Sequence, residues 1–277
     1  MNYTLSVYEK AMPAELTWAE RLEACRQAGF DALEISVDET EERLRRLEWT
    51  VEQRKELVET ALDAGVPIGS MCLSGHRKYP LGGAETCERG LLMMRRAVDF
   101  AADVGIRLIQ LAGYDVYYAP STPDTRRRFE DNLPKCVEMA AQRGVILGFE
   151  TMETPFMNTA EKAMKYVRMV DSPYLGVYPD IGNISNGTSD AVRDLRTAKG
   201  RLFAAHLKET KPDVFRDMSY GEGCVDFATL ITELLRLGVR YFNAEFWYRS
   251  GSDWQRVLKD SCDFLRGYFE KADTAEL

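Results

Sequence analysis

Eight short apolar runs recur along the chain, and amphipathic segments separate them almost to its end. Each run has the length and the β-branched and aromatic content of a buried strand, so the pattern predicts strands that alternate with helices. A closed (β/α)8 barrel needs eight such units, and 277 residues suit one domain of that class. The predicted strands are Leu5–Tyr8, Ala32–Val37, Pro67–Leu73, Leu108–Ala112, Val145–Phe149, Leu175–Tyr178, Leu202–Leu207 and Tyr241–Phe246.

Glycines separate predicted helices from the strands that follow them. The helix predicted over Ala19–Ala28 ends at Gly29, in the position where helices commonly end on a left-handed residue. A capping-box pattern, Thr50 followed by Gln53, opens the next helix. No linker or low-complexity stretch interrupts the repeat, so we expect a single domain over residues 1–277. The same helix–glycine–strand unit recurs at Gly65, Gly105, Gly144 and Gly238.

Composition narrows the class of partner. The formal net charge of −8 argues against nucleic acid or an anionic membrane as the main partner. The six cysteines form no C-x-x-C pair, which excludes zinc-finger and thioredoxin-like sites. The start of the chain lacks the pattern of a signal peptide, and no apolar run approaches the length of a membrane span. We therefore expect a reduced, cytoplasmic protein.

Four of the apolar runs lead to a side chain that binds metals. Glu150, Asp180, His206 and Glu245 follow or end predicted strands five to eight. Taken alone, a glutamate at a strand end is more often a salt-bridge partner, and a lone histidine is more often a core side chain. The carboxyl ends of parallel strands meet at one end of a barrel, however, so together the four predict a metal site. Carboxylate and imidazole ligands suit Mn²⁺, Mg²⁺, Co²⁺ or Zn²⁺.

Longer stretches carry a resemblance to a known family. They read YEKAMPAELTWAERL, LEISVDETEERLRRLEW, SMCLSGHRKYPLG, DVGIRLIQLAGYDVYY, VYPDIGN, HLKETKPDVFRDMSYGEGCVDF and AEFW, and they span nearly the whole chain. In these stretches the chain resembles the xylose-isomerase-like barrels, and within them the L-ribulose-5-phosphate (L-xylulose-5-phosphate) 3-epimerases of ascorbate and pentose catabolism. The resemblance implies metal-dependent epimerisation at C3 of a pentulose 5-phosphate, L-xylulose 5-phosphate or L-ribulose 5-phosphate.

The resemblance also assigns roles to residues. The related ketose 3-epimerases bind one divalent ion through Glu, Asp, His and Glu, which match Glu150, Asp180, His206 and Glu245. The two glutamates are the acid/base pair of that family. This fits the chemistry, because epimerisation beside a carbonyl passes through an enediolate and needs one carboxylate on each face. One departure is Asn183, which stands where those relatives have a histidine.

A phosphorylated substrate requires cations near the metal. Lys208 and Arg216 lie in the segment after His206, and His76 and Arg77 lie after the third predicted strand. We expect substrate contacts from Arg216, Lys208 and His76. Arg216 is the first choice, because related sugar epimerases use an arginine in this loop. Glu153 is a further expected substrate group. The alternative for each of these residues is a solvated position in a charged loop.

Three other functions compete with the epimerase. An epimerase or isomerase of a non-phosphorylated ketose or of hydroxypyruvate on the same fold differs only in lacking a phosphate pocket. A DNA-repair endonuclease of the same superfamily needs a histidine-rich three-zinc cluster and a basic surface, which two histidines and a negative chain do not supply. A non-catalytic sugar-binding barrel would not need both glutamates. We expect a small sugar phosphate as ligand and a homodimer or larger homo-oligomer.

Overall fold

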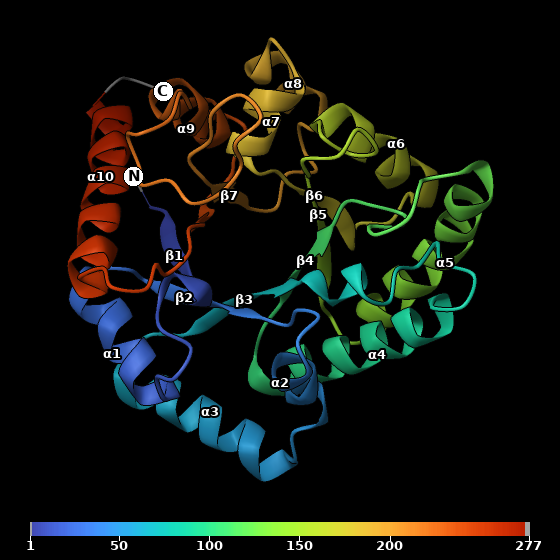
Figure 1. Ribbon diagram of the computed structural model, residues 1–277, viewed down its shortest axis with the longest axis horizontal. Coiled ribbons are helices and arrows are strands. Elements are labelled where there is room, and N and C mark those ends of the chain that lie inside the picture. Colours follow the sequence, from blue (N-terminus) through green and yellow to red (C-terminus); the bar gives the residue numbers. More distant parts are fainter. Residues whose placement is uncertain (1, 275–277) are drawn as a thin grey trace.

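Eight parallel strands form a barrel, and the helices lie around its outside (Figure 1). The computed structural model describes residues 2–274. Strands β1 to β6 are neighbours in chain order, and β1 also pairs with β8, which pairs with β7. Isolated bridges from Val177 to Leu202 and from Asp180 to His206 close the ring. The strands are β1 (Thr4–Tyr8), β2 (Ala32–Ser36), β3 (Ile68–Leu73), β4 (Leu108–Ala112), β5 (Ile146–Glu150), β6 (Leu175–Tyr178), β7 (Ala205–Leu207) and β8 (Tyr241–Ala244).

The predicted (β/α)8 barrel is therefore confirmed. Helices connect successive strands, as parallel pairing requires. The α-helices are α1 (Trp18–Ala28), α2 (Glu41–Leu44), α3 (Val51–Ala64), α4 (Cys87–Val104), α5 (Pro123–Gln142), α6 (Ala160–Val170), α7 (Ile181–Gly187), α8 (Ala191–Thr197), α9 (Phe227–Arg236) and α10 (Trp254–Thr274). Short 3-10 helices add η1 (Glu9–Ala11), η2 (Arg45–Glu48) and η3 (Ser74–Arg77).

Local signals fix where several helices begin and end. Thr17 and Thr50 each accept a hydrogen bond from the third helical residue, whose side chain bonds back to the threonine N–H. The capping box predicted at Thr50 is thus confirmed. Helix α1 ends at Gly29, whose φ of 94° is accessible to glycine at little cost. Helix α1 begins one residue before the predicted start, because Thr17 supplies the cap.

The largest error in the strand predictions concerns β7. The run Leu202–Leu207 predicts six strand residues, whereas β7 comprises only Ala205–Leu207. Leu202 instead forms an isolated bridge to Val177, and the regular ladder resumes only where β7 pairs with β8. Strand β5 lies one residue later than predicted, so Glu150 is its last residue rather than the first residue of the loop.

The apolar core fills the space between the sheet and the helices, and the barrel interior is more polar. Leu33 and Ile35 of β2 belong to the apolar core, while Glu34 between them is fully buried and bonds across the interior. This follows from the alternation of side chains along a strand. Other buried polar side chains of the strands include Ser70, Gln110, His206 and Asn243. The interior thus supplies hydrogen-bonding groups next to the strand ends that were predicted to carry the metal ligands.

Candidate metal centre and substrate pocket

The four predicted metal ligands converge at the carboxyl ends of β5 to β8. Glu150 ends β5, Asp180 follows β6 and caps α7, His206 lies within β7, and Glu245 follows β8 directly. One ligand atom from each lies within 4.8 Å of the others, and all four residues are buried. The structure therefore brings together the whole set that the strand ends predicted.

The carboxylate of Glu150 has two close polar neighbours. Gln110 of β4 donates a hydrogen bond to Oε2, and Nδ1 of His206 lies 2.9 Å from Oε1. Burial and the neighbouring carboxylate of Glu245 raise the pKa of Glu150 above its ordinary value. Glu150 is thus held rigidly and pointed into the cluster.

Lys208 provides a cation within the cluster. Its ammonium lies 2.8 Å from Oδ2 of Asp180 and 3.6 Å from Oε2 of Glu245, and its side chain is almost fully buried. Burial would lower its pKa, but Asp180 and Glu245 raise the pKa above its ordinary value, so the group stays charged. Lys208 and His206 in turn hold the pKa of Glu245 well below its usual range against the effect of burial. Lys208 therefore contacts metal ligands directly, and its predicted contact with substrate stays a prediction.

The donor set fits a divalent cation. Oδ2 of Asp180 and Oε2 of Glu245 are buried and have no aligned hydrogen-bond donor among the described residues. The ammonium of Lys208 lies near both oxygens, but it offsets only one of three buried negative charges, and the remaining charge is costly unless a further cation compensates it. When the imidazole is neutral, the three negative charges of the carboxylates are balanced by the positive charge of Lys208 and the two positive charges of one divalent ion. Three carboxylates and one imidazole are hard and borderline ligands, which suit Mn²⁺, Mg²⁺, Co²⁺ or Zn²⁺.

The imidazole of His206 bridges two groups of carboxylates. Nδ1 faces Glu150 and also lies 3.3 Å from Oε2 of Glu245, while Nε2 lies 2.8 Å from Oε1 of Glu34 in β2. The sequence prediction missed Glu34. A signal was present, because Glu34 is the one charged residue within the apolar run Ala32–Val37.

Two arginine–aromatic pairs flank the predicted substrate residue Glu153. Tyr117 donates a hydrogen bond to Glu153 at 3.2 Å, and the guanidinium of Arg77 lies over the Tyr117 ring at 4.8 Å. Nη2 of Arg216 lies 4.0 Å from Glu153, and its guanidinium lies over the indole of Trp247 at 5.3 Å. Arg216 and Glu153, predicted as substrate contacts from separate loops, are thus neighbours.

His76 and Arg77 occupy different environments although they are adjacent. The imidazole of His76 is buried beside the backbone of Gly90 in α4, and burial lowers its pKa to about 4. Arg77 instead shares the electrostatic environment of Tyr114, Glu153 and Glu150, and its Nε has no hydrogen-bond partner among the described residues. The position of His76 gives no support to its predicted substrate contact, and Arg77 is the better placed of the two.

Asn183 has a local structural contact. Its side-chain amide donates a hydrogen bond to the carbonyl oxygen of Thr151 at 2.7 Å, and its N–H donates to Oδ1 of Asp180. Oδ1 of Asn183 is buried and has no hydrogen-bond partner among the described residues. The residue that departs from the histidine of the related epimerases therefore ties the loop after β5 to the N-terminus of α7.

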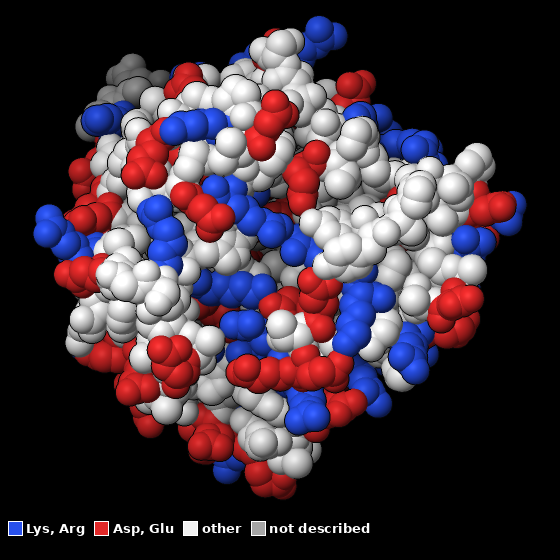
Figure 2. Space-filling view, viewed as in Figure 1, with Lys and Arg blue, Asp and Glu red and all other residues white. Residues whose placement is uncertain are grey.

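Cationic side chains gather around a hollow near the centre of the face shown in Figure 2, with acidic side chains between them. Some of the cations near the ends of β1 and β2 are already paired. Lys10 lies 2.5 Å from Asp38, and Arg43 lies 3.4 Å from the same carboxylate. Arg77 and Arg216 are less strongly paired: each guanidinium lies over an aromatic ring, and Arg216 is 4.0 Å from the carboxylate of Glu153.

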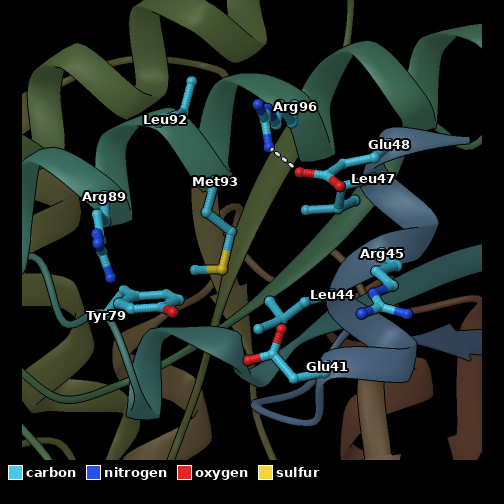
Figure 3. A pocket seen from close by; sticks show the side chains of 10 residues that line it. All are labelled: Glu41, Leu44, Arg45, Leu47, Glu48, Tyr79, Arg89, Leu92, Met93 and Arg96. Atoms are coloured by element: carbon cyan, nitrogen blue, oxygen red, sulfur yellow. Dashed lines mark hydrogen bonds and ion pairs between the residues drawn. The ribbon is translucent and has the colours of Figure 1, made fainter.

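A cavity of about 280 Å³ lies apart from this centre, between the α2–η2 segment and α4 (Figure 3). Leu44, Leu47 and Met93 contribute apolar side chains, and Arg96 forms an ion pair with Glu48 at its rim. None of the predicted metal or substrate residues lines it. This cavity is therefore separate from the chemistry of the strand ends.

Comparisons with known proteins identify the family. A family model described as a xylose isomerase-like TIM barrel matches residues 22–268. The chain is 44% identical over 275 residues to "L-ribulose-5-phosphate 3-epimerase UlaE" of Shigella flexneri, an alignment that covers 98% of this chain and 97% of that protein. The protein of the same name from Escherichia coli O157:H7 matches with the same identity and coverage.

Solved structures with low sequence identity share the fold. The structure of an L-ribulose 3-epimerase has a TM-score of 0.79 at 17% identity and covers 99% of this chain and 98% of that chain. D-Psicose 3-epimerase of Clostridium cellulolyticum H10, determined with D-tagatose, has a TM-score of 0.80 at 17% identity and covers 96% and 99%. At such identities the similarity concerns the fold alone. The 44% identity over almost the whole length shows that the chain is homologous to the L-ribulose-5-phosphate 3-epimerases. The chain therefore belongs to the xylose isomerase-like TIM barrels and, within them, to the L-ribulose-5-phosphate 3-epimerase family of enzymes.

Proposed function

We propose that the enzyme epimerises a pentulose 5-phosphate at C3, interconverting L-xylulose 5-phosphate and L-ribulose 5-phosphate. The observation that carries the proposal is the pair of buried glutamates, Glu150 and Glu245, which reach one cluster of ligand atoms from β5 and from the end of β8. The names of the relatives at 44% identity support the choice of substrate.

The two glutamates have the roles that epimerisation requires. One carboxylate removes the proton from C3, and the other returns a proton to the opposite face of the planar enediolate. A divalent ion held by Glu150, Asp180, His206 and Glu245 would stabilise the negative charge that develops on the substrate oxygens. Gln110 fixes the orientation of Glu150 by its hydrogen bond, so the carboxylate needs little reorganisation before proton transfer.

The arginines at the pocket favour a phosphorylated substrate over a free ketose. A phosphate group needs charged donors, and guanidinium groups bind it through paired hydrogen bonds. Arg216 has only a long ion pair with Glu153, at 4.0 Å, and Arg77 lies over the ring of Tyr117, with its Nε lacking a hydrogen-bond partner among the described residues. We propose that these two arginines bind the 5-phosphate, with Glu153 contacting the sugar hydroxyls.

The direct test of the function is a conversion assay. L-Ribulose 5-phosphate incubated with the enzyme should give L-xylulose 5-phosphate. The conversion can be monitored by ¹³C NMR. The alternative function, action on a non-phosphorylated ketose or on hydroxypyruvate, predicts faster turnover of those compounds. Higher kcat/KM for L-ribulose or hydroxypyruvate than for the phosphate ester would replace the proposal by that alternative.

Replacing Arg216 by Ala should raise KM for the pentulose 5-phosphate by roughly 10-fold or more, because a charged hydrogen bond contributes about 1.5–3 kcal/mol. Steady-state kinetics measures the effect, and metal content should stay at the wild-type level. Lys211→Ala, a change of another cation in the same loop with an exposed side chain, is the matched control and should leave KM unchanged. An unchanged KM for Arg216→Ala would show that this arginine is a solvated surface residue without a role in substrate binding.

The remaining expectations complete the proposal. Among residues 2–274, no helix combines the length and the apolar character that crossing a bilayer requires. We propose that the enzyme acts in the cytoplasm on a small sugar phosphate, with one Mn²⁺, Mg²⁺, Co²⁺ or Zn²⁺ per chain. We also propose a homodimer or larger homo-oligomer, which light scattering coupled to size-exclusion chromatography tests.

A further inference from the structure

Glu34 is a fully buried carboxylate that gathers donors from four other strands of the barrel. Oε1 accepts hydrogen bonds from Nε2 of His206 at 2.8 Å and from Nδ2 of Asn243 at 2.9 Å. Oε2 accepts hydrogen bonds from Ser70 at 2.7 Å and from the hydroxyl of Tyr178 at 3.0 Å. Each oxygen therefore has two partners, which come from β3, β6, β7 and β8.

This arrangement determines which nitrogen of His206 is free for a metal. A carboxylate that accepts hydrogen bonds requires Nε2 to carry the hydrogen, and a neutral imidazole then has its lone pair on Nδ1. Nδ1 is the nitrogen that faces Glu150 at 2.9 Å and Glu245 at 3.3 Å. The contact with Glu34 thus turns the lone pair of His206 toward the other ligands.

The other contacts of Glu34 keep its carboxylate in place. Asn243 shares Oε1 with His206, so the oxygen that holds the imidazole is itself fixed from β8. Ser70 and Tyr178 hold the second oxygen, and the Tyr178 ring also contacts the imidazole edge-on at 4.7 Å between ring centroids. Neither the orientation of the imidazole nor that of the carboxylate is left to a single contact.

Mere stability is a poor explanation for a charge at this position. Burying a carboxylate carries a large desolvation cost, and apolar side chains of similar volume are often at least as stabilising. Leu33 and Ile35 on either side show that β2 supplies apolar residues where only packing is needed. A buried carboxylate that bonds a metal-binding imidazole raises the basicity of that ligand and fixes its orientation.

We propose that Glu34 is a positioning residue for the metal centre, which orients His206 through Nε2 and strengthens its binding of a divalent ion through Nδ1. Among the described residues, no hydrogen bond or ion pair joins Glu34 to Glu150, Asp180 or Glu245, so it acts only through the histidine. This inference rests on the metal site of the proposed function.

The test is Glu34→Gln, with Mn²⁺ binding to the metal-free protein measured by isothermal titration calorimetry. Glutamine has nearly the same shape and can still accept from His206, but it lacks the negative charge. The affinity for Mn²⁺ should fall by about 10- to 100-fold, the scale found when a carboxylate behind a metal-binding histidine is removed. The visible absorption of the Co²⁺-loaded variant should also shift, because it reports the ligand field at the ion.

Glu233→Gln is the matched control. Glu233 is a buried glutamate on α9. Its ion-pair partner is Arg196 at 2.7 Å, which is not a residue of the metal cluster. The same chemical change removes the ion pair of this buried glutamate, yet the variant should bind Mn²⁺ with wild-type affinity. Circular dichroism melts of both metal-free variants separate effects on folding from effects on the ion.

A second variant covers the case in which Glu34→Gln does not fold. Glu34→Asp keeps the charge but shortens the side chain by one methylene, so its carboxylate cannot reach Nε2 in the same position. It should also bind Mn²⁺ at least about 10-fold more weakly. Affinity within threefold of wild type for either folded variant would overturn the inference.

The failure of this inference is distinguishable from the failure of the proposed function. A wild-type protein that binds Mn²⁺ but does not epimerise pentulose phosphates would remove the proposed substrate and leave the test of Glu34 intact. If the wild-type enzyme is active and the folded Glu34 variants bind Mn²⁺ with wild-type affinity, only the proposed role of Glu34 is refuted. A wild-type protein without affinity for any divalent ion would overturn both.

Discussion

Dialysis against a chelator is expected to abolish the epimerase activity, and Mn²⁺ is expected to restore it. The ligand atoms of Glu150, Asp180, His206 and Glu245 lie within 4.8 Å of one another in a buried site, and two carboxylate oxygens there have no aligned donor. Without a divalent ion, these residues have little with which to stabilise the negative charge of an enediolate. The rate of interconversion before dialysis, after it and on readdition of Mn²⁺, Mg²⁺, Co²⁺ or Zn²⁺ measures the effect.

The same preparation must show that the loss is chemical and not structural. The metal-free protein should keep its circular dichroism spectrum and a cooperative melt, because the apolar core between sheet and helices does not depend on the ion. Asp180→Asn should lower the metal content of the purified enzyme together with its activity. Full activity in protein shown to be metal-free would refute the metal-dependent mechanism.

The fold was largely predictable because its signals are local. Apolar runs mark buried strands, and caps such as Thr50 and Gly29 mark the ends of the helices between them. The error at Leu202–Leu207 has a different origin, because hydrophobicity reports burial and not pairing. Leu202 is largely shielded and bridges to Val177, yet the chain forms a regular ladder only from Ala205 onward.

The metal ligands were also predictable, because parallel strands in a barrel bring their carboxyl ends together. That rule places Glu150, Asp180, His206 and Glu245 side by side without any knowledge of side-chain contacts. Glu34 escaped the prediction because it lies in the middle of a strand and contacts His206 across 172 positions of sequence. A charged residue inside an apolar run was the only local sign of it.

The substrate residues show where sequence reasoning loses precision. Proximity in sequence could not separate His76 from Arg77, because the 3-10 helix η3 sends adjacent side chains in different directions. His76 is buried beside α4, while Arg77 reaches the Tyr117 ring. The closest partner of Lys208 is the carboxylate of Asp180, and its expected contact with substrate stays a prediction. The direction in which a single loop side chain points decides whether it can contact the substrate, and sequence periodicity carries no information about that direction.

Glu150→Gln and Glu245→Gln should each lower kcat by at least about 100-fold, the usual scale for losing a positioned acid or base. Each change removes the group that takes or returns a proton on one face of the enediolate. Metal content has to be measured for both variants, because both residues are also expected metal ligands. Glu233→Gln again serves as the control and should keep wild-type kcat, since its partner is Arg196. Near-wild-type kcat in either metal-loaded glutamine variant would exclude a two-base mechanism.

The position of solvent deuterium in the product distinguishes this mechanism from its nearest relative. Epimerisation by two glutamates exchanges the hydrogen at C3, so the reaction in D₂O should place deuterium at C3 of the product and little or none at C1. A variant that lacks only the second base should still exchange the C3 hydrogen of the substrate without inverting it, which NMR of the recovered substrate detects. Aldose–ketose isomerisation moves hydrogen between C1 and C2 instead. Deuterium at C1 would therefore assign an isomerase activity to the same barrel and the same four ligands, and it would replace the proposed epimerisation.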